Sequence, residues 1–290
     1  MDYVVGNTGQ NSFYRASGGY PVRVYAKDFD SNGIYDMIPS LYLPDQEGKM
    51  KEFPAPSRDD LIGQVNAMRK KFPTYKSYAT ATMEDVLPEK SRKGALILEA
   101  DNLQSSFLQN NGNGKFSMTP MPAQVQFSLI NGMIADDFDG DGNTDIIMNG
   151  NDYGTDVFIG RYDAFNGLFI KGEGKGRFLP ETILQSGIFI PGNGKALVKL
   201  RAANGACLIA ASQNRGPLKI FQLKRKCKTI PLESLDVKAE IRYKNGKTLI
   251  QECYYGSSFL SQSGRFLLIG DSVISVKITN SLGKARNINL

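Results

Sequence analysis

The chain has 290 residues, of which 41% are hydrophobic, and its 35 Lys and Arg against 29 Asp and Glu give a formal charge of +6. This length permits one large or two modest hydrophobic cores. The absence of His excludes Ser-His-Asp and Cys-His nucleophiles and His-ligated metals. The sequence contains no run of ~18 apolar residues, so no membrane span is predicted.

The first predicted elements are short strands that precede and follow an Asp-rich loop at residues 28–36. Its polar residues alternate along the chain, so that they can surround a hard cation, which favours calcium. Three carboxylates and one amide predict a weaker site than four carboxylates. The ligand positions are Asp28, Asp30, Asn32, Ile34 (through its carbonyl) and Asp36. Asp2 and the residues after it match the end of such a unit, which predicts that this chain is a piece of a longer repeat protein.

Residues 45–95 break the β pattern and are predicted to be a helical insertion. Within it, residues 57–72 have Ser57 as a plausible N-cap, acidic residues in the first turn and basic residues in the last. One apolar stripe is formed by Leu61, Val65, Met68 and Phe72. A shorter helix is predicted near residues 82–87. Two roles stay open: covering a sheet edge, or forming a lid or wall for a binding surface.

The strongest motif is a second Asp-rich loop at residues 137–145. Carboxylates stand at positions 1, 3, 5 and 9, and Gly142 at position 6 permits a sharp turn. The flanks indicate short strands rather than EF-hand helices, and position 12 is Met148 rather than Glu. We therefore predict a calcium loop between two strands, with a solvated acidic turn as the alternative. The ligand positions are Asp137, Asp139, Asp141, Asn143 (through its carbonyl) and Asp145.

Further strand pairs suggest a repeated unit. Segments 106–116 and 168–178 share one plan of strand, Gly-rich turn and strand. A third pair, at 195–200 and 206–211, is joined by a turn without a carboxylate, so no metal is expected there. Repeats of this size cannot bury a hydrophobic face alone and must stack on one another.

Aromatic residues gather after the second Asp-rich loop. Tyr153, Tyr162 and Phe165 lie among Asp and Arg residues. Aromatic faces flanked by carboxylates suit sugar rings, which makes these three the candidate ligand-binding residues. Packing inside a sheet is the alternative explanation.

A basic run at residues 224–228 lies between the two proposed parts of the chain, and we predict that it is an exposed linker rather than a nucleic-acid surface, because aromatic residues do not interleave it. A hairpin with an Asn-Gly turn is predicted at 244–252, and an alternating strand at 273–278. The three cysteines lack C-x-x-C spacing, so zinc and redox functions have no support. Cys207 is predicted to be a buried thiol; whether Cys227 and Cys253 pair stays open.

The loops and their flanking strands resemble the FG-GAP/VCBS repeats of integrin-type β-propellers. In that family each repeat forms one blade and the Asp-rich loop binds calcium, so the resemblance assigns a main site to 137–145 and a weaker one to 28–36. The match covers about residues 1–225. Residues 256–263 resemble part of the ASPIC/UnbV domain, which follows such repeats, although the usual Trp-containing strand is absent. No catalytic residues accompany that resemblance.

The expected fold is mainly β: β-propeller-type blades at 1–225, forming part of a propeller, with a helical insertion at about 45–95 and a small C-terminal β domain at 226–290. The expected function is that of a non-enzymatic, calcium-binding recognition or adhesion protein. Such loops fill only near ~0.1–1 mM calcium, which predicts an extracellular, cell-surface or periplasmic location.

The expected partner is a glycan or a cell-surface protein, not nucleic acid, and the remaining blades belong to a longer parent chain. Two alternatives stay open. One is a polysaccharide-active enzyme or accessory module that uses carboxylates, and the other is a purely architectural segment.

Overall fold

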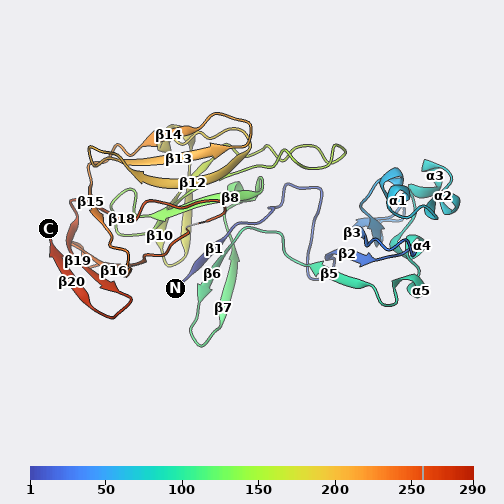
Figure 1. The fold of residues 1–290 in the computed structure, drawn as a ribbon, viewed down its shortest axis with the longest axis horizontal. Coiled ribbons are helices and arrows are strands. Elements are labelled where there is room, and N and C mark those ends of the chain that lie inside the picture. The colour runs from blue at the N-terminus through green and yellow to red at the C-terminus, as the bar shows by residue number, and fades with distance from the viewer. Residues whose placement is uncertain (257) are drawn as a thin grey trace. The chain divides into compact units, whose positions relative to one another are not determined.

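The computed structural model describes residues 1–256 and 258–290 and is mainly β, with 42% strand and 11% helix. The sheets formed by these residues are antiparallel, and none of them is closed. Two compact units are present: residues 1–11 together with 104–290, and residues 12–103. The smaller unit therefore interrupts the larger one along the chain (Figure 1). It contains the predicted helical insertion, whereas the predicted boundary at 225/226 lies inside the larger unit and stays a prediction.

The smaller unit is a four-stranded sheet with short helices between its last two strands in the sequence. The strand order is β4-β3-β2-β5. The strands are β2 (Val22–Lys27), β3 (Asp36–Pro44), β4 (Met50–Pro54) and β5 (Leu96–Ala100). The helices are α1 (Arg58–Gln64), α2 (Met68–Lys71), α3 (Tyr75–Tyr78), α4 (Met83–Val86) and α5 (Glu89–Arg92). Their apolar side chains form one core with Tyr25 and Ile38 of the sheet.

The predicted helix at 57–72 is confirmed at its start and wrong in its continuity. The side chain of Ser57 accepts a hydrogen bond from the Asp60 N–H and caps α1. The helix then ends, because Val65 adopts an extended conformation with φ −120° and ψ 90°; this β-branched residue follows Gly63, a weak helix former. The apolar stripe is nevertheless buried, with every member at most 8% exposed. The shorter helix is confirmed as α4, which begins with a capping box.

The larger unit begins with three sheets that contain most of the predicted repeat strands. Their orders are β1-β6-β7, β11-β10-β9-β8 and β12-β13-β14. The first two sheets comprise β1 (Tyr3–Val5), β6 (Ser106–Asn110), β7 (Phe116–Pro120), β8 (Ile130–Asp136), β9 (Asp145–Gly150), β10 (Leu168–Gly174) and β11 (Arg177–Glu181). The third comprises β12 (Gly194–Arg201), β13 (Cys207–Gln213) and β14 (Lys219–Gln222), and the short helices are η1 (Ala123–Gln126) and α6 (Ile183–Ser186).

The repeated hairpin plan is confirmed by matching backbone conformations. In the turn between β6 and β7, residues 112, 113 and 114 have φ values of +81°, +52° and +71°. In the turn between β10 and β11, residues 174, 175 and 176 have φ values of +76°, +52° and +70°. Gly is needed at the outer positions of both turns, because other residues rarely adopt such angles.

The C-terminal part contains a two-stranded and a four-stranded sheet, with orders β15-β18 and β17-β16-β19-β20. Their strands are β15 (Lys228–Pro231), β16 (Asp236–Tyr243), β17 (Thr248–Glu252), β18 (Phe266–Ile269), β19 (Val273–Asn280) and β20 (Ala285–Asn289). The Asn-Gly hairpin and the strand at 273–278 are thus confirmed. Strand β18 joins two cores, because alternate side chains enter different hydrophobic clusters. Ser257, within the 256–263 segment, lies outside the described residues.

Candidate metal centres

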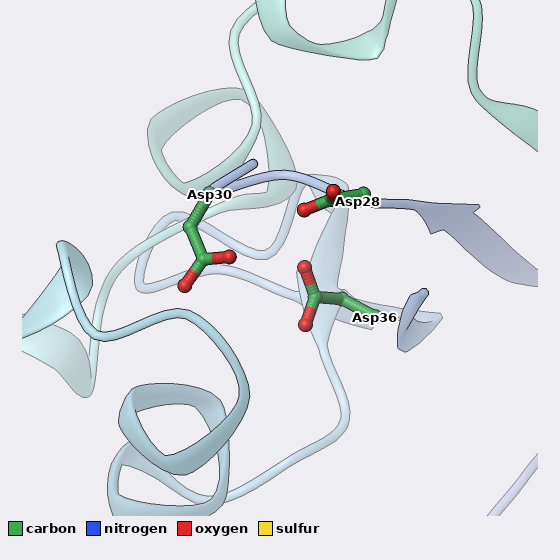
Figure 2. A group of neighbouring side chains, drawn as sticks. All are labelled: Asp28, Asp30 and Asp36. Carbon is green, nitrogen blue, oxygen red and sulfur yellow. The ribbon is translucent and has the colours of Figure 1, made fainter. Parts of the chain in front are cut away.

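The 28–36 loop connects β2 to β3 and folds around its own carboxylates. The backbone N–H groups of Asn32 and Gly33 donate to the two oxygens of Asp28 at 3.0 and 2.9 Å. The N–H of Phe29 donates to Asp36 at 2.9 Å. One carboxylate oxygen from each of Asp28, Asp30 and Asp36 lies within 4.8 Å of the others. Figure 2 shows these three side chains approaching one another.

Among the residues that the structure describes, no cationic side chain pairs with this acidic cluster. Asp36 is 4% exposed, and this burial, together with the charges of Asp30 and Asp28, raises its pKa. The Oδ1 atom of Asp30 is buried and accepts no hydrogen bond. The arrangement therefore fits a bound divalent cation.

The 137–145 loop connects β8 to β9 and repeats the same backbone design. The N–H of Gly142 donates to Asp137 at 3.2 Å, and the N–H of Phe138 donates to Asp145 at 3.0 Å. These bonds occupy the same loop positions as those of Gly33 and Phe29. Oxygens of Asp137, Asp139 and Asp145 again lie within 4.8 Å of one another. The structure thus brings together three of the four predicted carboxylates, while Asp141 lies outside that group.

Cationic and hydroxyl groups surround this second loop. The ammonium of Lys171 contacts Asp139 and lies 3.4 Å from a carboxylate oxygen of Asp141. Lys247 donates to the side-chain oxygen of Asn143 at 3.0 Å. The Tyr243 hydroxyl donates to Asp137 at 2.7 Å, and Arg225 donates to the backbone carbonyl of Asp137 at 2.9 Å. Side chains from outside the loop therefore already contact Asp137, Asp139 and Asp141.

The third strand of each sheet explains the difference between the loops. β10 runs alongside β9, and the Gly172 N–H donates to Asp145 at 2.9 Å, which places Lys171 next to the loop. In the smaller unit, β4 ends at Pro54, opposite Ser40, and the chain turns into α1. The Met37 N–H instead donates to the side chain of Gln64. No strand within residues 1–256 and 258–290 therefore brings a cation to the 28–36 loop.

Asp2 has a bond equivalent to that of Asp145. Its Oδ1 atom accepts from the Asn110 N–H at 2.8 Å, across a sequence separation of 108 residues. The pairing of β1 with β6 places Asn110 in the position that Gly172 has beside β9. That Asp2 ends a third metal loop stays a prediction, but its strand context is the one found in the 137–145 unit.

The three candidate aromatic residues do not share an exposed surface. Phe165 is 3% exposed and packs in a hydrophobic core. Tyr153 and Tyr162 are partly buried, and the Arg161 guanidinium lies 4.8 Å from the centroid of the Tyr153 ring. The ring of Phe165 therefore contributes to packing, and only the two tyrosines offer partly open faces.

A cavity of about 1050 Å³ lies in the larger unit. Residues from β1, β8, β12 and β17 contribute to its lining. The polar residues of the lining include Asp136, Lys199, Glu252, Tyr254 and Arg265. Sequence patterns did not identify this site, because its residues come from strands far apart in the chain.

The basic run at 224–228 is not simply an exposed linker, so this expectation is wrong in part. Arg225 is partly buried and binds the 137–145 loop, and β15 begins at Lys228. The three cysteines are free thiols; Cys207 is buried as predicted, and burial raises its pKa to about 12.

Comparison of the sequence with protein-family models and with curated proteins gave no match. Sequence reasoning identified both acidic loops but missed Lys171, Arg225, Tyr243 and Lys247, which decide how the second loop is neutralised. None of the helices in the described residues is both long and apolar enough to cross a membrane.

Proposed function

We propose that this chain is a calcium-binding recognition or adhesion protein that works outside the cytosol and holds its ion in the 28–36 loop. The observation that carries the proposal is the convergence of three carboxylates that include a buried oxygen without a hydrogen bond and that have no cationic partner in the described part of the chain. A calcium ion would supply the missing positive charge and join the ends of β2 and β3. The oxygen donors would be Asp28, Asp30, Asn32, Ile34 (through its carbonyl) and Asp36.

The sheets support a propeller-type architecture of FG-GAP/VCBS-like blades. The β8–β11 sheet is a four-stranded antiparallel meander in which sequence neighbours pair, the usual layout of a blade. The β12-β13-β14 sheet has a shorter version of this layout, and the β1-β6-β7 sheet follows it only when the inserted residues 12–103 are left out. We propose that further blades of a longer parent chain complete the ring and that the C-terminal sheets form an ASPIC/UnbV-like domain.

We propose a glycan as the partner. The 1050 Å³ cavity has Tyr254 in its lining, with that residue 56% exposed, and Glu252 beside it. The Arg265 guanidinium lies 4.0 Å from the centroid of the Tyr255 ring, so a second aromatic face is held nearby. Open aromatic faces with adjacent polar groups suit sugar rings. Calcium loops of this kind fill at ~0.1–1 mM, which supports a function outside the cytosol.

Calorimetric titration with calcium tests the metal site. The wild-type chain should bind calcium, and Asp30→Asn and Asp36→Asn should each remove binding at the 28–36 loop. Asp101→Asn is the matched control, since Asp101 is an exposed carboxylate of the same unit outside the cluster. Equal binding by all three variants, or a melting curve that EDTA does not move, would refute the assignment.

A glycan array combined with a screen for hydrolase and lyase activity tests the function. Binding without turnover supports recognition, and Tyr254→Ala should weaken it. Turnover of a polysaccharide would instead favour the enzyme alternative. Binding only to a cell-surface protein would refute the glycan partner while leaving the recognition function in place.

A further inference from the structure

We propose that Lys171 is the built-in counter-ion of the 137–145 loop and takes the place that a metal ion would occupy there. Its ammonium bridges the carboxylates of Asp139 and Asp141, which stand at positions 3 and 5 of the motif. Both carboxylates are about one-third exposed, so the pair is accessible but not freely solvated. Only the comparison with 28–36 as the occupied site rests on the proposed function.

Contacts from the C-terminal part hold the loop on its other side. Tyr243 is 2% exposed, and its hydroxyl donates to the same Asp137 oxygen that accepts from Gly142. Lys247 engages Asn143 and also the backbone carbonyl of Asp141 at 3.3 Å. The Ser272 hydroxyl donates to the Gly140 carbonyl at 2.8 Å. The loop is thus held by protein groups on its outer side as well as by Lys171.

The charge at position 171 is not required for strand pairing. In the matching hairpin, the equivalent position is Gln109, which precedes Asn110 as Lys171 precedes Gly172. The 28–36 loop has the same backbone bonds and no cation. The contact between Lys171 and the 137–145 loop is therefore specific to the β11-β10-β9-β8 sheet and does not follow from the shared hairpin plan.

This counter-ion would reverse the order of calcium affinity that the sequence predicts for the two loops. A divalent ion in the 137–145 loop would lie beside the Lys171 ammonium, which already contacts carboxylates that would bind the ion. Two positive charges on the same carboxylates repel each other strongly. The loop with four carboxylates should therefore bind calcium more weakly than the loop with three. On this proposal the 28–36 loop, rather than the 137–145 loop, would be the main calcium site.

Metal stoichiometry in three variants tests this proposal. Lys171→Met removes the charge, Lys171→Arg keeps it, and Lys115→Met removes an exposed charge from the β6–β7 hairpin. Calcium titration should give one site for the wild type, Lys171→Arg and Lys115→Met, and two for Lys171→Met. Adding Asp139→Asn to Lys171→Met should return the count to one.

Thermal unfolding gives a second readout, because the Lys171→Met loop has uncompensated carboxylates. This variant should melt below the wild type in EDTA and recover in calcium, whereas Lys115→Met should follow the wild type. Two sites in the wild type, or an unchanged count and melting curve in Lys171→Met, would overturn the proposal. A wild type with no site and a Lys171→Met variant with one would support the counter-ion and refute the 28–36 assignment.

Discussion

Replacing Lys199 by Met should destabilise the larger unit strongly. The Lys199 and Asp136 side chains are 6% and 2% exposed and form a direct ion pair. The ammonium also lies 3.3 Å from the Phe266 carbonyl and 4.7 Å from the centroid of its ring. Without it, Asp136 would keep a buried charge with no cationic partner, which costs about 3–5 kcal/mol. In a unit of about 200 residues, this corresponds to a Tm lower by ~6–20 °C.

Thermal unfolding followed by circular dichroism measures the loss. Lys195→Met is the control, because this residue lies on the same strand and pairs with Asp152 at 3.6 Å in a more exposed setting; the expected cost is below ~1 kcal/mol. Adding Asp136→Leu to Lys199→Met should recover most of the loss, since both charges are then removed together. Equal Tm changes for Lys199→Met and Lys195→Met would refute the reasoning.

Three further outcomes follow from the structure. Calcium at 100 times its Kd should stabilise the smaller unit by ~2.7 kcal/mol; Asp36→Asn should abolish the shift in a calorimetric scan, and a full shift in that variant would contradict the site. Arg286 binds Asp236 at 2.6 and 2.5 Å and lowers its pKa, so this stabilisation is present at neutral pH and is lost as pH falls through the folded-state pKa. Arg286→Met should therefore lower stability at pH 7 and reduce the additional loss on acidification, and parallel acid-unfolding curves would argue against this. Limited proteolysis should release residues 12–103 as a folded fragment, whereas cleavage within the β2–β3 hairpin first would contradict a compact unit.

The sequence was sufficient where structure depends on local spacing. The Asp and Gly positions of each loop fix the backbone hydrogen bonds, and both loops indeed fold alike. The strands next to them follow from short apolar runs, and the cap at Ser57 follows from its position before acidic residues. The helix break at Val65 was missed, because the helical spacing of apolar residues continues past Val65 although the helical backbone conformation ends there.

The environment of the second loop depends on contacts between distant parts of the chain. Lys171 is 32 residues from Asp139, Arg225 is 88 residues from Asp137, and Tyr243 is 106 residues from Asp137. No periodicity links these positions. One signal was present in the sequence: Lys171 stands where the matching hairpin has Gln109. The two positions can be recognised as equivalent only when the strand register is known.

The position of the smaller unit within the chain has a consequence for folding during synthesis. β1 emerges from the ribosome well before its partner β6, since Asp2 and Asn110 are 108 residues apart. Residues 12–103 have a core of their own, and β2 pairs with β5 so that Val22 lies opposite Ala100. Once folded, this unit presents its incoming and outgoing strands as neighbours and shortens the effective loop between β1 and β6. During synthesis, residues 12–103 can therefore fold first, and β1 can pair with β6 later without a large loss of chain entropy.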